Sequence, residues 1–372
     1  MHPDIIVIGA GAVGAAIAYG LTRKRLRVLV LDGDDGDYRA ARANFGLVWL
    51  QGKGLNMPAY QELTRRSVDL WPDFAAELAS LTSTGLQYEH NGGLVFCLGE
   101  DAFEKRRLDL QRLHNELGGA EADWQMLDRV ELAKLFPKIR FGADVTGASF
   151  GRRDGHANPL RLLAALHAGI VRLGGDLRRN AAVRQILPGD EGFTIAFGEE
   201  NASAPRLVIA AGLGCQVLAR QLDLKIPLRP QRGQVLVTER LAPFLPLPAS
   251  GLRQTREGTV MIGATHEETG FDVSTTTVAA ADLSRRTVRV VPALADATLV
   301  RQWAGLRIMT PDNCPIYAQS RTYPGAFVAL CHSGVTLAAL HAVVLAEAIA
   351  SGELPTFFDA FHQRRFDVPK AA

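Results

Sequence analysis

Three glycines near the N-terminus have a spacing that could do chemistry. Gly9, Gly11 and Gly14 form the pattern GxGxxG, with Ala12 and Val13 between the last two. Gly9 would permit a tight turn, Gly11 would let backbone N–H groups approach a pyrophosphate, and Gly14 would let a helix pack closely on a strand. The free N–H groups and the dipole at the start of that helix would stabilise the anion. The spacing therefore predicts a diphosphate cradle made by these five residues.

The elements that must position this cradle are visible on either side of it. Residues 4–9 are a continuous apolar run closed by glycine, typical of a strand buried on both faces of a parallel sheet. Residues 14–26 have helical periodicity, and residues 27–31 form a second buried strand that ends at Asp32. Asp32 could accept hydrogen bonds from a ribose diol. A glycine turn that binds nothing is the alternative, and the same fingerprint serves both NAD and FAD.

Further along the chain, helical and strand patterns alternate. Amphipathic periodicity predicts helices over 61–81, 102–117, 159–173 and 275–291, and a helix of small residues ending near Ser351. Short apolar runs predict strands at 93–98, 182–186, 207–212, 233–237, 258–263 and 325–330. The runs after residue 233 are separated by Pro, Arg and Gly, as in an antiparallel sheet.

These patterns predict an α/β fold in which two domains are interleaved, because no linker or repeat separates them. We expect a discontinuous dinucleotide-binding domain of Rossmann type from residues 1–85, 145–215 and 300–372. The α+β substrate-binding domain, with an antiparallel sheet, is expected from residues 86–144 and 216–299.

Composition excludes several classes of protein. The 372 residues carry 41 Lys and Arg against 39 Asp and Glu, so no strong field favours nucleic acid. No cysteine stands in a spacing typical of zinc or iron–sulfur, so we expect no metal site and reduced thiols in the cytoplasm; the four are Cys97, Cys215, Cys314 and Cys331. The residues before the first strand lack the pattern of a signal peptide, so we expect no export, and the apolar run 338–350 is too short to cross a bilayer. Peripheral association with the inner face of the membrane stays open.

Six short segments, in order along the chain, resemble the FAD-dependent amino-acid oxidase and dehydrogenase family that includes D-amino acid dehydrogenase, glycine oxidase and sarcosine oxidase. The resemblance covers essentially the whole chain. The segments are the glycine fingerprint, Arg42 to Gly46, Val208 to Gly212, Gln231 to Gln234, Gly305 to Asp312, and His332 to Leu337. The family implies non-covalent FAD on a glutathione-reductase type domain, and Cys314 stands at a different offset from the flavin-linking cysteine of sarcosine oxidases.

The resemblance assigns several more residues to the cofactor. The loop that contains Arg42, Asn44, Phe45, Gly46 and Leu47 would run along the flavin, although Asn44 would equally suit a loop-capping turn. Val183 would meet the adenine, and Ala211 and Gly212 would pass the ribityl and pyrophosphate groups. A helix starting near Ser333, Gly334, Val335 and Thr336 would point free N–H groups at the reduced flavin, where negative charge gathers. A buried helix with a Ser/Thr cap is the alternative.

The resemblance also implies a substrate site. Arg307 matches the carboxylate-binding arginine of the family, although a structural ion pair is the alternative. His332 would border the flavin and could bind flavin or substrate, or be structural. Trp49, Gln51 and His266 are further candidates for the pocket, with a core position the alternative for Trp49. Hydride transfer from a neutral amine requires positioning more than a strong base, and no histidine declares itself as one.

These inferences predict oxidation of the C–N bond of a small amino or imino acid. His156 to Pro159 and Cys331 to Leu337 look most like the catalytic β subunits of dehydrogenases for D-hydroxyproline, opines or proline. Electrons would then leave to partner subunits with flavin or iron–sulfur centres. The alternatives are a glycine or sarcosine oxidase that releases H2O2, an NAD(P)-dependent reductase, and a non-catalytic FAD-binding assembly subunit.

Overall fold

The computed structural model describes residues 2–33, 40–116 and 122–367, and its centre is a six-stranded sheet. The strand order is β17-β18-β12-β1-β2-β8, and only β17 runs antiparallel to its neighbour. The strands are β1 (Ile5–Ile8), β2 (Val28–Leu31), β8 (Asp176–Arg178), β12 (Leu207–Ile209), β17 (Ile316–Gln319) and β18 (Ala326–Leu330). The buried strands predicted around the glycine fingerprint, β1 and β2, therefore lie side by side in the sheet, as do β1 and β12.

Both faces of this sheet are covered, which explains why its strands are continuously apolar. On one face, Ile5 and Val7 pack against helices that include α1 (Ala12–Arg23), α3 (Pro58–Thr82) and α6 (Pro159–Arg172). The same face carries α9 (Ala338–Leu340), a π-helical turn (His341–Leu345) and α10 (Ala346–Ser351). On the other face, Ile6 and Ile8 pack against α7 (Cys215–Arg220) and a separate sheet of β9 (Val183–Gly189), β10 (Gly192–Phe197) and β11 (Glu200–Ala204).

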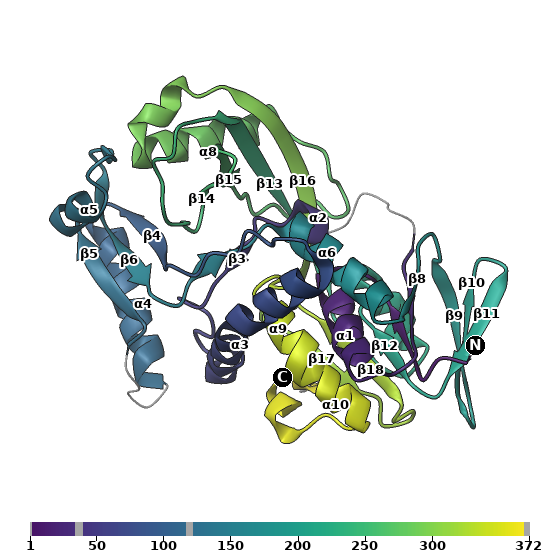
Figure 1. The fold of residues 1–372 in the computed structure, drawn as a ribbon. Coiled ribbons are helices and arrows are strands. Elements are labelled where there is room, and N and C mark those ends of the chain that lie inside the picture. Colours follow the sequence, from purple (N-terminus) through teal and green to yellow (C-terminus); the bar gives the residue numbers. More distant parts are fainter. Residues whose placement is uncertain (1, 34–39, 117–121, 368–372) are drawn as a thin grey trace.

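A second body of antiparallel sheets lies beside the first (Figure 1). One sheet has the order β14-β15-β13-β16, from β13 (Arg229–Arg240), β14 (Leu252–Gln254), β15 (Thr259–Gly263) and β16 (Leu299–Met309), and α8 (Thr277–Val290) packs on it. The other has the order β4-β6-β5, from β4 (Gly93–Leu98), β5 (Trp124–Asp128) and β6 (Val145–Gly151), with α4 (Glu100–Glu116) and α5 (Arg129–Leu135). A parallel bridge between Leu94 and Ala249 joins the two sheets.

The α/β fold with interleaved parallel and antiparallel parts is confirmed, since the chain enters each part more than once. The exact domain limits stay a prediction. The predicted limits at residues 145 and 300 assign strands β6 and β16 to the dinucleotide-binding domain. In the structure both strands pair with strands of the antiparallel sheets. The helix over 102–117 corresponds to α4, and position 117 lies outside the described residues.

A short segment connects the two parts. It runs through α2 (Ala40–Ala43) and β3 (Leu47–Val48), and β3 pairs antiparallel with β7 (Gly155–His156). Across the described ranges, no single helix has the length and apolar character to cross a membrane. By length and composition one bent pair does, Ala338–Ser351 with Thr356–Phe366, at an angle of 111°.

Candidate functional site

Two of the three fingerprint glycines are required by packing within the protein. Gly9 has φ +103°, and a Cβ there would lie 2.5 Å from the carbonyl oxygen of Ala210 on the neighbouring strand. A Cβ on Gly14 would lie 1.9 Å from the carbonyl oxygen of Gly9. The turn from β1 into α1 therefore closes only with glycine at both positions.

Gly11 is different, because no contact with another described residue requires it to lack a side chain. It is the N-cap of α1, it offers no side-chain cap to the helix, and its backbone is extended at φ −69°. A Cβ there would meet only the Ala41 Cβ, at 3.9 Å. Among the described residues no other atom lies within 4 Å of that position, which precedes the first turn that Ala12 and Val13 begin. The cradle fits the pyrophosphate of a dinucleotide, which the helix N-terminus favours.

The other residues predicted to hold a dinucleotide gather at the carboxyl ends of neighbouring strands. Asp32 follows β2 and is buried, and its carbonyl accepts a hydrogen bond of 2.7 Å from Ala181 N–H. That bond brings Val183, at the start of β9, close to the end of β2. At β12, Ala211 Cα lies 3.0 Å from the Cβ position of Gly9. Gly212 follows with φ +59°.

The predicted flavin loop is held by β16. Trp303 Nε1 donates to the carbonyl of Ala43 at 3.2 Å, and a Cβ on Gly305 would lie 2.2 Å from the Ala43 Cβ. Gly305 therefore lets the loop approach the sheet. Arg42 is exposed on α2, and Phe45 packs against Gly263 at the end of β15.

A turn shapes the loop beyond Phe45. The Asn44 side chain accepts a hydrogen bond of 2.8 Å from Gly46 N–H, which is the loop-capping role. Gly46 has φ +90°, and a Cβ there would lie 2.3 Å from the carbonyl oxygen of Ala157. The loop then continues directly into Leu47 of β3.

The C-terminal segment folds back onto the cradle. A Cβ on Gly334 would lie 3.3 Å from the Ala12 Cβ and 3.5 Å from Val13 Cγ2, so this glycine sits against the first turn of α1. Its neighbours Ser333 and Val335 are buried. Residues more than 300 positions apart therefore form one site, as the family resemblance implies.

Thr336 ties this segment to the flavin loop. Its hydroxyl donates to the Leu47 carbonyl at 3.1 Å and accepts from Trp49 N–H at 3.2 Å. The Thr336 carbonyl accepts from Ser67 Oγ at 2.8 Å and from Trp71 Nε1 at 2.9 Å.

These bonds correct the predicted start of the C-terminal helix. Residues 334–337 form turns, and α9 begins only at Ala338. The Thr336 carbonyl is occupied by two side chains of α3, and Leu340 N–H, its partner in a regular helix, donates to Ser67 Oγ at 3.3 Å instead. Hydrogen bonds to side chains of α3 thus replace those of the first helical turn, and the helix begins later than predicted.

Arg307 is a half-buried cation that contacts backbone oxygens. Its Nη1 donates to the carbonyls of Thr265 at 2.8 Å and Arg232 at 3.4 Å. Gly233 makes room for it, since a Cβ there would lie 2.7 Å from Nη1. Burial lowers its pKa, and within the described part of the chain no carboxylate forms an ion pair with it. The guanidinium is therefore free to bind a carboxylate ligand.

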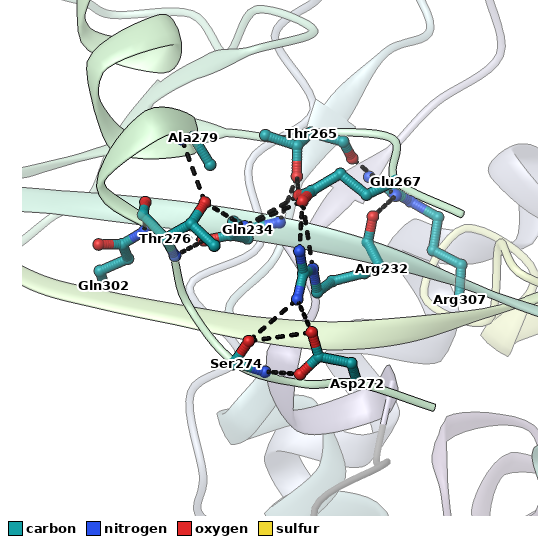
Figure 2. A network of polar contacts seen from close by, with 10 residues as sticks. All are labelled: Arg232, Gln234, Thr265, Glu267, Asp272, Ser274, Thr276, Ala279, Gln302 and Arg307. Atoms are coloured by element: carbon teal, nitrogen blue, oxygen red, sulfur yellow. Dashed lines mark hydrogen bonds and ion pairs between the residues drawn. The ribbon is translucent and has the colours of Figure 1, made fainter. Parts of the chain in front are cut away.

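A polar network fixes the oxygen that holds Arg307 (Figure 2). Glu267 accepts from Arg232 Nη2 at 2.6 Å, from Gln234 Nε2 at 2.9 Å and from the Thr265 hydroxyl. Arg232 also bonds Asp272 and, at 3.1 Å, the Ser274 hydroxyl. The charge of Glu267 is thus neutralised by Arg232, and Arg307 lies at the edge of the network, where the Thr265 carbonyl holds it.

His332 lies in a cluster that contains a lysine which sequence reasoning missed. Lys53 Nζ donates to Ser333 Oγ at 2.7 Å and lies 3.4 Å from His332 Nε2. The Tyr60 hydroxyl donates to the same Ser333 oxygen at 3.0 Å. Burial, followed by the charges of Lys53 and Arg307, holds the pKa of His332 well below its usual value, so its imidazole is neutral. The position of this lysine between Gly52 and Gly54, directly after the flavin loop, was the sequence feature that could have predicted it as a site residue.

The three further pocket candidates lie in different surroundings. His266 lies at the surface, and its Nδ1 is 3.1 Å from Gln231 Oε1. Partial burial of its ring, followed by the charge of Arg307, lowers its pKa. Trp49 is buried against Gly93 of β4. Gln51 is also buried: its amide donates to the Gly93 carbonyl at 3.0 Å, and its Oε1 accepts from Arg106 at 2.8 Å. His266 is thus near Arg307, whereas Trp49 and Gln51 are tied to the β4 sheet.

Comparisons with known proteins identify the family and the fold of this chain. A family model described as "DAO: FAD dependent oxidoreductase" matches residues 4–348. The B subunit of opine oxidase from Rhizobium meliloti is 41% identical over 368 residues, which cover 99% of each chain. Two solved structures share the fold: glycine oxidase from Geobacillus kaustophilus, with a TM-score of 0.87, 24% identity and 96% of each chain covered, and L-proline dehydrogenase from P. horikoshii, with a TM-score of 0.85, 21% identity and 98% of each chain covered.

Proposed function

This chain belongs to the DAO family of FAD-dependent oxidoreductases, and we propose that it is the catalytic β subunit of a dehydrogenase acting on opines, D-hydroxyproline or proline. The family resemblance, FAD as cofactor and FAD-dependent oxidation of amino acids in general are confirmed. The specific proposal rests on one observation, an uncompensated Arg307 beside the C-terminal segment that meets the cradle.

The residues of this chain would bind and orient the substrate. When bound, FAD supplies a hydride acceptor for the Cα–H of a neutral amine. Arg307 would hold the substrate carboxylate with paired donors, and the Thr265 carbonyl keeps its guanidinium in place. His332 is neutral and can accept a hydrogen bond without adding charge. Gly9, Gly11 and Gly14 would fix the diphosphate, and Thr336 would keep the flavin loop against the C-terminal segment.

A partner chain is part of the proposal. The similar protein from Rhizobium meliloti is named as one of the subunits of an opine oxidase, which supports assembly with other chains. Among the described residues no group of three or more His, Cys, Asp or Glu could hold a metal ion, so further electron carriers would come from partners. We propose a cytoplasmic location. A glycine or sarcosine type of oxidase that acts alone is the alternative activity, and a non-catalytic protein that binds FAD for assembly is the alternative class.

Anaerobic titration of the FAD-loaded protein tests the proposal. D- and L-proline, D-hydroxyproline, N-carboxyalkyl amino acids, sarcosine and glycine would be added in turn, and loss of the flavin absorption band would be followed. We expect bleaching by an opine, a hydroxyproline or a proline, with slow reoxidation by air and fast reoxidation by an artificial acceptor. Bleaching by glycine or sarcosine alone, with rapid release of H2O2, would instead support the oxidase. Bound FAD that no compound bleaches would contradict the proposal.

A further inference from the structure

Lys53 is an ammonium group whose described direct contacts, the Ser333 hydroxyl and the His332 imidazole, carry no negative charge. It is half-buried, and its Nζ contacts the hydroxyl of Ser333 and lies beside the neutral imidazole of His332. It also lies 5.6 Å from the centre of the Tyr60 ring. In residues 2–33, 40–116 and 122–367 no carboxylate comes within ion-pair distance of it, whereas Lys24 pairs with Glu347 and Lys105 pairs with Asp109.

Burial of a cation without a paired anion costs desolvation free energy, and this cost applies to both Lys53 and Arg307. Burial lowers the pKa of Lys53 to about 8, because removing water disfavours the charged form. Arg307 is likewise half-buried with only carbonyl partners among the described residues. Natural proteins pair buried charges with a side chain, a metal or a ligand. Two ligand anions would satisfy both groups.

The two cations belong to the same site. Lys53 Nζ lies 3.4 Å from His332 Nε2, and the charge of Arg307 lowers the pKa of the same imidazole, so both cations act on one side chain. They come from different elements, Lys53 from the turn after β3 and Arg307 from β16. A ligand with one carboxylate would pair with one of these two cations and leave the other without an anion.

We propose that Lys53 is a second carboxylate-binding group of this site, and that the substrate is an iminodicarboxylic acid, a secondary amine with a carboxylate on each side. Arg307 binds one carboxylate and Lys53 the other, so the nitrogen and its Cα–H are fixed at two points. This inference rests on the proposed function, because it names the substrate class for the same reaction.

Two small compounds test the role of Lys53 directly. Iminodiacetate and sarcosine are the same secondary amine except that iminodiacetate has one more carboxylate. Their binding to the FAD-loaded protein would be measured at pH 7 without oxygen, by calorimetry and by perturbation of the flavin spectrum. We expect iminodiacetate to bind at least about tenfold more tightly than sarcosine. Lys53→Met should weaken iminodiacetate by about thirtyfold or more and leave sarcosine nearly unchanged.

Two variants act as controls. Lys53→Arg keeps the charge and should preserve most of the preference for iminodiacetate. Lys105→Met removes a lysine that is exposed on α4 and paired with Asp109, so it should change neither affinity. A flavin spectrum like that of the wild type in Lys53→Met would show that the variant folds and holds FAD.

The outcomes separate this inference from the proposed function. Equal binding of both compounds by the wild type, binding of neither, or an unchanged preference in Lys53→Met would overturn the assignment of Lys53. The proposed function would still stand if an amino or imino acid with one carboxylate bleached the flavin. It would fall only if no compound in the wider titration did so.

Discussion

At the scale of single residues, two arginines of the same sheet have opposite surroundings. Arg232 is only 4% exposed and is matched by the carboxylates of Glu267 and Asp272. Arg307 lies across the β13–β16 pair, opposite Gln231, and its hydrogen bonds within the described chain go to carbonyl oxygens. Arg232 therefore stabilises the sheet, whereas Arg307 keeps its charge available for a ligand.

Removing the Arg307 charge should weaken carboxylate substrates. We expect Arg307→Ala to lower affinity by about 2–5 kcal/mol, because a desolvated anion would lose its partner. Titration of the flavin spectrum with the best substrate measures this. Arg285→Ala, which removes an exposed arginine paired with Asp282 on α8, should have no effect. Unchanged affinity in Arg307→Ala would remove Arg307 from the site.

The charge of Lys53 should give the site a pH dependence. Since burial lowers the pKa of Lys53 to about 8, the ammonium is present below pH 8 and is lost above it. The preference for iminodiacetate over sarcosine should therefore fall as the pH rises above about 8, and binding titrations from about pH 6 to about pH 10 measure it. Lys53→Arg should show no such fall, because arginine stays charged. A fall of the same size in Lys53→Arg would point to another group.

Most of the groups that face Lys53 keep the same charge between about pH 6 and about pH 10. Burial raises the pKa of the thiols of Cys314 and Cys331 to about 12 and also raises the pKa of the Tyr60 hydroxyl. His332 is neutral throughout this range, because its pKa lies well below the usual value. Burial raises the pKa of Asp154 to about 7, and its ionisation would oppose a second carboxylate beside Lys53, so a fall centred near pH 7 that persists in Lys53→Arg would point to Asp154.

The sequence predicted Arg307 and His332 as site residues, but it did not predict Lys53. Arg307 stands in a recognisable Gly-Leu-Arg motif, and the structure brings His332 within its electrostatic reach. Lys53 meets Ser333 across 280 positions of the chain, and no local pattern reveals such a contact. Which charges are compensated depends on tertiary packing, and periodicity does not report it.

At the scale of elements, a substitution of Gly11 at the start of α1 should affect cofactor binding but not folding. Gly11→Ala should leave the stability of the protein without FAD within about 0.5 kcal/mol, because its φ suits alanine and a Cβ meets no atom of the described residues closer than 3.9 Å. The new methyl group would occupy the space for the pyrophosphate, so affinity for FAD should fall at least about tenfold. Thermal unfolding and flavin fluorescence measure the two quantities.

A matched glycine checks this prediction. Gly85→Ala adds a methyl group outside the cradle, where none of the residues that the structure describes has an atom within 4 Å, and should change neither stability nor FAD affinity by much. Tight FAD binding by Gly11→Ala would mean that the cofactor does not approach the start of α1.

The Thr336 hydroxyl joins two elements and should stabilise both. Thr336→Val keeps the shape but removes the bonds to the Leu47 carbonyl and Trp49 N–H, leaving buried polar groups without a partner. We expect a loss of about 1–3 kcal/mol in the free energy of unfolding and faster release of FAD. Thr194→Val, at an exposed pair with Ser203 on β10, is the control. Equal effects of the two variants would contradict the linking role of Thr336.

Most helices could be predicted because each has a periodic face. The residues expected over 159–173 form α6 (Pro159–Arg172), where Asn158 caps the helix and Pro159 occupies its first turn. The start of the C-terminal helix could not be predicted, because side chains of α3 occupy the hydrogen bonds of its first turn.

At the scale of the whole molecule, the interleaving was visible in the sequence but the strand pairing was not. The alternation of buried runs predicted two kinds of sheet. The sheet of β9, β10 and β11 was predicted only in its first strand: β11 has mostly exposed polar residues and resembles a loop, whereas the alternation of Phe193, Ile195 and Phe197 in β10 was a signal that the prediction missed. Pairing partners such as β12 and β18 lie more than a hundred residues apart, a distance over which local pattern carries no information.

The return of Gly334 to the first turn of α1 has a consequence for how the protein matures in the cell. When the ribosome has synthesised the glycine fingerprint, the C-terminal residues that contact it are still missing. The central sheet also needs β18, which is synthesised late. Cofactor capture is therefore a late event, and a nascent chain that stalls before Gly334 should stay colourless.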